Sequence, residues 1–502
     1  MTTTSLLALG SWLLALPCLA ESESQEPGAK SFQQRKPNLI LILADDLGWT
    51  DLGCTGSDLY LTPNLDRLAQ QGLRFNSAYA ACTVCSPTRA ALMTGKYPAR
   101  LHLTDWIPGE KHPKFKLKLP DWTQYLPKEE VTIATALKPA GYISASIGKW
   151  HLGPVQGHLP TDHGFDINIA GCSMGQPPTY FAPYRIPTLA DGPPGEYLTD
   201  RETDEACRFI EDNKDRPFFL YLPHYCVHTP LQAKADLVKQ YKEKVTPGMR
   251  HTNATYAAMI HSMDESTGRI MAKLDELKLT DNTVVIFTSD NGGLLRSTSN
   301  KPLRAGKGSA YEGGVRVPLF IKWPGVTQAG SVCDEPVISM DLYPTLLEAA
   351  GGATASLPWN AEHNQNVDGR SLLPLLKDPA LSLDRDAIFW HYPHYHGGGA
   401  TPYSAIRCGD WRLIEFFEDD RVELYNLHDD IGEQQELAAR LPEKAAELRK
   451  RIHDWRAVVN AQRPTPNPDY DPKVQRKAAN DREPAFDLES AGLLAEEGLD
   501  YP

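Results

Sequence analysis

The chain has 502 residues, of which 41% are hydrophobic and 23% charged, and its formal net charge is −13. A chain of this length and composition can bury one large core and a smaller second one. The negative charge argues against nucleic acid or an anionic membrane as a partner, because its field repels polyanions, and an anionic ligand would need a locally basic pocket.

The N-terminus has the pattern of a signal peptide. An apolar run over residues 6–20 is too short to span a bilayer and ends before Glu21 in the manner of a signal-peptidase site, although no Lys or Arg precedes it. We therefore expect a secreted or periplasmic protein without a transmembrane segment. The nine cysteines show no spacing typical of a disulfide framework or a zinc site.

The first buried strand ends in two carboxylates. Residues 37–44 form a continuous apolar run, typical of a strand buried on both faces of a parallel sheet, and Asp45 and Asp46 follow it. In open α/β sheets ligands bind at this end of the strands. Two adjacent acids repel each other unless a cation joins them, so the pair predicts a divalent cation site, with a solvated turn as the alternative.

Residues 62–72 predict a short helix that plays a scaffolding part. Thr62 is placed to cap it, proline takes its first position and glycine ends it. Leu65 and Leu68 would face the core.

The sequence from Ala81 to Gly95 reads ACTVCSPTRAALMTG. Pro87 suits a first helical turn, which places Cys85 at or just before a helix N-terminus, where a thiol ionises easily and an anion is held. This suits a nucleophile that acts on a charged ester. A Cys82-x-x-Cys85 redox pair and a buried structural thiol are the alternatives, but neither explains the order Cys-x-Pro-x-Arg, which ends at Arg89.

A basic stretch over residues 111–119 follows. Lys114, Lys116 and Lys118 alternate with apolar residues, as in an edge strand with its lysines on one face. These lysines could prevent edge-to-edge aggregation or form a basic lip for a polyanionic substrate, and the sequence leaves both open.

Two further buried strands end in titratable residues. One runs into Gly-Lys149-Trp-His151-Leu-Gly, and the next leads to a loop with His224 and His228. A lysine and a histidine in a glycine-flanked turn after a strand can both project into a ligand crevice. We expect His228 to belong to the site and His224 to be structural.

A fourth buried strand delivers Asp290 and Asn291. Together with the first two aspartates they make an all-oxygen donor set, which favours Ca²⁺, allows Mg²⁺ or Mn²⁺ and disfavours zinc. The loop that follows, GKGSAYEGGVRVP from residue 306 to 318, contains Lys307.

The alternation of strands and helices predicts an α/β fold, with a large, mixed, mostly parallel sheet sandwiched by helices and a smaller C-terminal antiparallel sheet packed by a helix. Buried strands are expected over residues 37–44, 142–147, 217–222, 284–288 and 318–323, and short antiparallel strands over 388–391, 403–408, 411–416 and 422–426. Helices are expected over 132–140, 256–277, 341–350 and 433–459. Asn253-Ala254-Thr255 is a glycosylation sequon that matters only in a eukaryotic source.

Four strings together resemble the type I sulfatases of the alkaline phosphatase superfamily. They are Cys-x-Pro-x-Arg with Leu-Met-Thr-Gly, Gly-Lys-Trp-His-x-Gly, His228 before Thr-Pro, and Lys307 before Glu-Gly-Gly-x-Arg-Val-Pro. The resemblance runs from residue 37 to about 459. It implies that a formylglycine-generating enzyme converts Cys85 to formylglycine and that one Ca²⁺ binds to Asp45, Asp46, Cys85, Asp290 and Asn291.

The resemblance also implies roles for the other residues. Arg89 and Lys149 would hold the formylglycine hydrate and the sulfate, while His228 and Lys307 would bind the sulfate and aid departure of the leaving oxygen. His151 would be the base that collapses the intermediate. Such a set is coherent, because cations must neutralise the charge that develops when an oxyanion attacks a sulfate monoester.

By the same resemblance the protein is a sulfuric ester hydrolase acting on a sulfated carbohydrate more readily than on a small aryl sulfate. A phosphodiesterase or phosphonate monoester hydrolase of the same superfamily, and a non-catalytic glycan-binding protein, are the alternatives. Residues 391–399 are rich in His and Tyr and could cover the pocket or form an exposed loop.

The expected domain organisation has five parts. They are a signal peptide (1–20), a linker (21–36), a catalytic domain (37–380), a C-terminal subdomain (381–462) and a largely unstructured polar tail (463–502). The sequence leaves open the sulfate position, exo or endo action and the oligomeric state.

Overall fold

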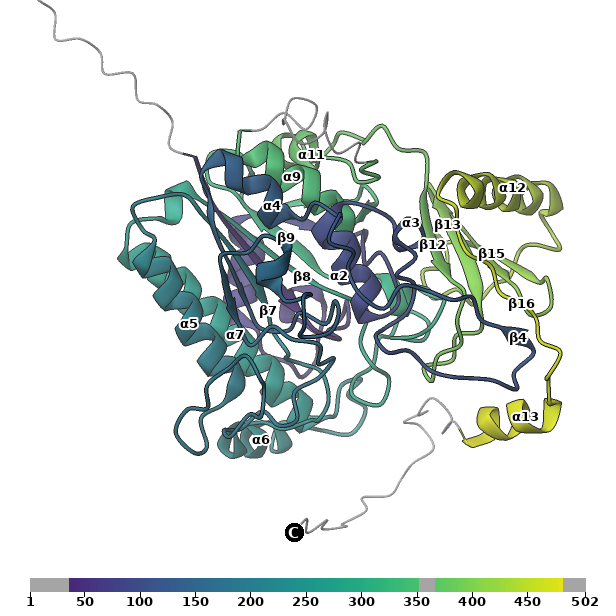
Figure 1. The fold of residues 1–502 in the computed structure, drawn as a ribbon, viewed down its shortest axis with the longest axis horizontal. Helices are drawn as coiled ribbons and strands as arrows, with labels where there is room; N and C mark the ends of the chain where they lie inside the picture. The colour runs from purple at the N-terminus through teal and green to yellow at the C-terminus, as the bar shows by residue number, and fades with distance from the viewer. Residues whose placement is uncertain (1–35, 352–365, 482–502) are drawn as a thin grey trace, which may run out of the picture. The chain divides into compact units, whose positions relative to one another are not determined.

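The computed structural model describes residues 36–351 and 366–481. Its centre is an eight-stranded sheet in the order β10-β2-β9-β8-β1-β7-β5-β6, in which only β9 runs antiparallel to its neighbours (Figure 1). The strands are β1 (Asn38–Ala44), β2 (Leu73–Phe75), β5 (Ile143–Ile147), β6 (Ile167–Ile169), β7 (Phe218–Pro223), β8 (Thr283–Ser289), β9 (Leu319–Lys322) and β10 (Ser331–Cys333). The mostly parallel sheet and its buried strands are confirmed, whereas the predicted signal peptide lies outside the described residues.

The side chains of β1 alternate between two cores, one on each face of the sheet. Ile40 and Ile42 pack with α1 (Pro63–Gln71), α5 (Leu198–Asp212) and α7 (Ala254–Glu276). Leu39 and Leu41 pack with α2 (Cys85–Thr94), α4 (Ile133–Leu137) and α9 (Leu342–Ala349) on the other face. The unbroken apolar run of β1 therefore reflects burial on both sides. Within the described ranges no helix is long and apolar enough to cross a membrane.

The remaining short elements connect these layers. They are α3 (Pro98–Leu101), α6 (Ala235–Lys242), α8 (Glu312–Val315), α11 (Leu373–Lys377), the pair β3 (Ala78–Tyr79) and β11 (Val337–Ile338), and five 3₁₀ turns at Gly53–Thr55, Lys138–Ala140, Pro160–His163, Thr280–Asn282 and Ser339–Asp341.

Helix α1 lies where the sequence predicts it and buries Leu65 and Leu68, but the predicted cap is wrong. The Thr62 side chain makes no capping bond. Its hydroxyl instead accepts from the Gly53 N–H at 2.8 Å and donates to Asp66 at 2.9 Å. The tertiary bond to the preceding turn thus replaces the local one.

Helix α7 has a true side-chain cap, Asn253, whose amide oxygen accepts from the N–H groups of Thr255 and Tyr256. We expect Asn253→Ala to lower the free energy of unfolding by about 1 kcal/mol, because a donor at the helix start then loses its partner. Asn253→Ser keeps a capping oxygen and should lose only a fraction of that. Chemical denaturation of the three proteins measures the difference, and an alanine variant as stable as wild type would contradict it.

The C-terminal region forms the expected antiparallel sheet, with β12 (Ile388–Tyr392), β13 (Tyr403–Cys408), β14 (Trp411–Phe416) and β15 (Val422–Asn426) in sequence order. Helix α12 (Pro442–Val458) lies alongside this sheet (Figure 1). Its Leu448 and Ile452 pack with Leu413 of β14. The other face packs against the segment around α2, with Trp390 in that core. The domain boundaries at 380 and 462 stay predictions.

Three expectations for this region are wrong. The helix predicted over 433–459 begins only at Pro442, because a proline disfavours the helical backbone conformation in the residue that precedes it. The tail predicted to be largely unstructured contains β16 (Thr465–Pro466) and the ten-residue helix α13 (Pro472–Asp481) in its described part. The strand predicted over 111–119 is reduced to β4 (Leu117–Lys118), which pairs with β16 instead of lying bare at an edge.

Candidate active site

The ends of β1 and β8 bring four oxygen-bearing side chains together, since the last residues of the two strands pair with each other. Asp45 and Asp46 leave one strand, and Asp290 and Asn291 leave the other. The Asp46 N–H donates to Asp290 Oδ1 at 3.2 Å, and Asn291 Nδ2 donates to Asp46 Oδ1 at 2.8 Å. All four residues are at most 2% exposed.

The donor set fits a hard divalent cation. Asp45 Oδ1 and Asn291 Oδ1 are buried and accept no hydrogen bond from the described residues, a costly state for buried acceptors. Burial raises the pKa of Asp45 to about 8, although Lys149 Nζ lies 2.7 Å from Asp45 Oδ2 and acts in the opposite sense. Two buried oxygens therefore lack a hydrogen-bond partner among the described residues and burial disfavours the charged form of Asp45, and a bound Ca²⁺ would relieve both.

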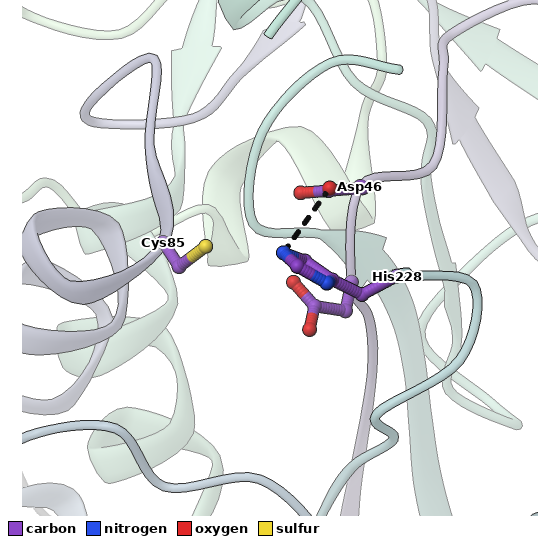
Figure 2. Close-up of side chains that lie close together, drawn as sticks. Asp46, Cys85 and His228 are labelled. Atoms are coloured by element: carbon purple, nitrogen blue, oxygen red, sulfur yellow. Dashed lines mark ion pairs between the residues drawn. The ribbon is translucent and has the colours of Figure 1, made fainter. Parts of the chain in front are cut away.

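Cys85 is the first residue of α2, as predicted, and is 2% exposed. Figure 2 shows its sulfur on the side that faces Asp46 and His228, and ligand atoms of Asp45, Asp46, Cys85 and His228 all lie within 4.8 Å of one another. Burial by itself would raise the pKa of the thiol, but Lys149 and Lys307 lower it to about 6. The site thus stabilises negative charge at position 85.

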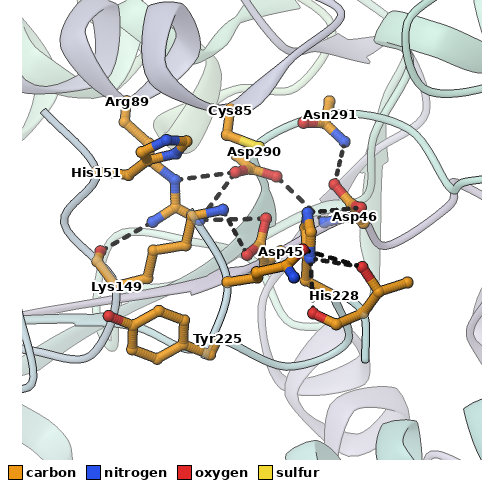
Figure 3. Close-up of polar contacts among 12 residues, drawn as sticks. Asp45, Asp46, Cys85, Arg89, Lys149, His151, Tyr225, His228, Asp290 and Asn291 are labelled. Atoms are coloured by element: carbon orange, nitrogen blue, oxygen red, sulfur yellow. Dashed lines mark hydrogen bonds and ion pairs between the residues drawn. The ribbon is translucent and has the colours of Figure 1, made fainter. Parts of the chain in front are cut away.

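Three buried cations surround this position. Arg89 Nε and Nη2 contact Asp290 Oδ2 at 2.9 and 2.8 Å, and Arg89 Nη1 donates to the Lys149 carbonyl at 2.9 Å (Figure 3). Lys307 Nζ lies 2.6 Å from Asp46 Oδ1 and 3.5 Å from Cys85 Sγ. Burial alone would raise the pKa of Asp46, yet Lys307 holds it below its usual range. An arriving anion therefore meets fixed positive charge.

The two histidines present different nitrogens to the site. His228 Nδ1 donates to the Thr229 carbonyl at 2.9 Å, so its Nε2, 3.5 Å from Asp46 Oδ2, faces the site. His151 Nε2 donates to the Ile107 carbonyl at 2.6 Å, which leaves Nδ1 as the lone-pair nitrogen, buried and without a partner in the described structure. Burial and the neighbouring Lys149 hold the pKa of His151 well below its usual range, so it is neutral and can accept a proton.

The structure brings together all ten residues that the sequence singles out for the site; nine of them are buried and His228 is partly buried (Figure 3). His224 is not among them: its Nδ1 lies 2.6 Å from Glu202 Oε2 and its Nε2 lies 3.1 Å from Ser266 Oγ, which supports the structural assignment.

Two residues that position the Lys307 loop are not singled out by the sequence. Thr83 Oγ1 donates to the Ser309 carbonyl at 2.8 Å, and the Gly308 N–H donates to the Thr83 carbonyl at 3.0 Å, so Thr83 fastens the Lys307 loop to the Cys85 segment. Arg412, in β14, donates from Nη2 to the Ala310 carbonyl at 2.6 Å. Thr83 lies inside the Cys85 motif, but nothing local in the sequence signals a partner more than 200 positions away.

Residues 391–399 are not an exposed loop in their first half. His391 and Tyr392 belong to β12, and His394 is fully buried with its Nε2 2.8 Å from Thr104 Oγ1. The second half lies against the Lys307 loop, because the Ala400 N–H donates to the Gly308 carbonyl at 2.8 Å. The C-terminal sheet thus supplies one wall of the region around Lys307.

Two protein-family models match this chain. The family model described as "Sulfatase" matches residues 37–353, and the model described as "N-sulphoglucosamine sulphohydrolase, C-terminal" matches residues 306–458. A protein described as a sulfatase from Formosa agariphila is 34% identical, over 89% of this chain and 93% of its own length. Human steryl-sulfatase is 33% identical, over 77% of both chains.

Solved structures agree with the sequence comparison. Ps i-CgsB, solved in complex with k-i-k-neocarrahexaose, superposes with a TM-score of 0.71 at 30% identity, over 89% of this chain and 98% of that one. The match extends across both sheets.

Proposed function

This chain belongs to the sulfatase family of the alkaline phosphatase-like superfamily and is a sulfuric ester hydrolase, and on that premise we propose that it cleaves a sulfate monoester of a sulfated carbohydrate through formylglycine made from Cys85. The observation that carries the mechanism is Cys85 at a helix N-terminus, facing a buried oxygen cluster and two lysines. The carbohydrate assignment is supported by the C-terminal family model and by the saccharide bound to Ps i-CgsB.

We assign the metal site to Asp45, Asp46, Asp290 and Asn291, with the oxidised side chain at position 85 completing it. A Ca²⁺ ion bound there would neutralise charge on the sulfate and on the attacking oxygen. The chain's own cations do the rest: Arg89 and Lys149 orient the hydrated side chain at 85, whereas Lys307 and His228 hold the sulfate and stabilise the departing oxygen.

The reaction has two steps in this scheme. One hydroxyl of the hydrated aldehyde at position 85 gives up its proton and attacks sulfur, the bond from sulfur to the substrate oxygen breaks, and the leaving oxygen takes up one proton beside His228 and Lys307. His151 Nδ1 then removes the proton of the second hydroxyl, whose oxygen forms the C=O bond while sulfate leaves. A serine or an unmodified cysteine has no second hydroxyl and would stop after the first step.

Export and maturation are part of the proposal. The N-terminal apolar run fits secretion or export to a periplasm, and the Cys-x-Pro-x-Arg order fits recognition by a formylglycine-generating enzyme. Protein for assay must therefore be produced with an export route and a formylglycine-generating enzyme.

The test of the proposed function is a substrate panel. Protein co-expressed with a formylglycine-generating enzyme is assayed for sulfate release from sulfated saccharides and a small aryl sulfate, and for turnover of matched phosphodiesters and phosphonate monoesters. We expect the highest kcat/KM on a sulfated saccharide. Faster turnover of a phosphorus ester, or binding of saccharide without product, would contradict the proposal.

A further inference from the structure

We propose that Lys114, Lys116 and Lys118, here called the lysine strip, bind the sulfated chain beyond the ester that is cleaved, so that the preferred substrate is an extended polyanionic glycan. This inference rests on the proposed function. It concerns a surface outside the buried site, and it selects between the two readings that the sequence leaves open for these lysines.

The strip is a one-sided array of charge. The three lysines are exposed, while Phe115 and Leu117 between them are buried in a small cluster with Tyr395. The Phe115 and Tyr395 rings meet edge to face with centroids 4.9 Å apart. The apolar side chains therefore hold the segment down and turn its lysines outward.

The backbone of the strip is fixed by the C-terminal segment. Asn467 Nδ2 donates to the Phe115 carbonyl at 2.7 Å, and Gln475 Oε1 accepts from the Lys116 N–H at 3.0 Å. β16 pairs with β4 on one side. An aggregation guard needs only exposed lysines, whereas the backbone of this segment is also fixed by side chains from a distant part of the chain.

The strip carries positive charge that its surroundings do not cancel. None of its lysines forms an ion pair with any residue in the described ranges, where the ion pairs pass from His112 directly to Lys138. Segments 111–118 and 465–477 together contain seven Lys or Arg residues and two Asp residues, on a chain whose net charge is −13. A local basic surface on an acidic protein attracts a polyanion at short range while the rest of the molecule repels it.

One chain segment connects the lysine strip to the active site. The segment that ends in the strip begins at Ile107, whose carbonyl accepts from His151 Nε2. Between the two, Glu110 Oε1 accepts from the Gly397 N–H at 3.0 Å, in the same loop that binds Gly308 next to Lys307. The chain from Ile107 to Lys118 spans at most about 40 Å when fully extended. The lysines therefore lie no more than about 40 Å from Ile107, a separation that an extended glycan with one sulfate at position 85 would span.

The test compares two triple variants of equal charge change. K114Q/K116Q/K118Q removes the strip, and K239Q/K242Q/K244Q removes three exposed lysines in and just after α6, elsewhere on the chain. Binding is measured with dextran sulfate as the probe and unsulfated dextran as the blank, and activity with a sulfated oligosaccharide and a small aryl sulfate. Thermal unfolding confirms that both variants fold.

We expect the strip variant to bind dextran sulfate at least about tenfold more weakly, with a flatter dependence of affinity on salt, because fewer counterions are released. Its KM for the oligosaccharide should rise, while kcat/KM for the aryl sulfate stays at the wild-type value. Equal losses in both triple variants, or unchanged binding in the strip variant, would overturn the inference. If wild type hydrolyses no sulfate ester but binds the probe more tightly than the strip variant does, the proposed function fails while the binding role of the strip stands.

Discussion

A Cys85→Ala variant is expected to lose at least about 10⁴-fold in kcat/KM for sulfate esters, since no other group in the site can form the covalent ester. The methyl group of alanine takes up less space than the thiol it replaces, and Lys307 keeps its contact with Asp46, so the fold should be retained. Sulfate release under single-turnover and steady-state conditions measures the loss.

Cys82→Ala provides the matched control. Cys82 lies in the same segment, is 3% exposed, and has a thiol whose pKa burial raises to about 12, so it stays protonated. Its backbone N–H and carbonyl both bond to the Thr88 hydroxyl. We expect this variant to keep activity close to wild type. An active Cys85→Ala protein, or an equal loss in both variants, would defeat the assignment of Cys85 as nucleophile.

Removal of Ca²⁺ should have the second large effect. Exhaustive chelation is expected to reduce kcat by at least about 100-fold, because the buried charge on the sulfate then lacks a divalent counter-charge. The melting temperature should also fall by several degrees, since a ligand at about 100 times its Kd adds about 2.7 kcal/mol to stability. Added Ca²⁺ should restore both, and full activity in metal-free protein would contradict the metal site.

Two variants separate loss of the metal from loss of stability. Asn291→Ala removes an unpaired buried oxygen at the carboxyl end of β8, so more Ca²⁺ should be needed for half-maximal activity. Asn38→Ala removes a buried amide at the opposite end of β1, where Nδ2 donates to Thr283 Oγ1 at 3.2 Å. It should cost stability without changing the Ca²⁺ requirement. Identical Ca²⁺ titrations for the two would argue against Asn291 as a ligand.

The sequence predicts best the features that local pattern determines. The apolar run before Asp45 can only be a strand buried on both faces, and parallel strands place their carboxyl ends at one edge, so the meeting of Asp45 with Asp290 follows from two local patterns. Pro87 in the first turn likewise places Cys85 at the start of α2.

Contacts between distant segments explain the features that the sequence predicts wrongly or not at all. Thr62 looks like a cap, but Gly53 and Asp66 compete for its hydroxyl. Residues 465–477 read as a polar tail, because their order comes from bonds between Asn467 or Gln475 and a backbone more than 350 positions away. Arg412 and Thr83 shape the Lys307 loop by the same kind of contact, which leaves no periodicity or turn signal in the sequence.

Conversion of Cys85 to formylglycine can be read from the mass of the tryptic peptide from Phe75 to Arg89, taken from a preparation shown to release sulfate and treated with a thiol-alkylating reagent. We expect a peptide alkylated at Cys82 alone, with position 85 lighter than cysteine by roughly 18 Da, the change from thiol to aldehyde. A peptide alkylated at both Cys82 and Cys85 throughout an active preparation would contradict it.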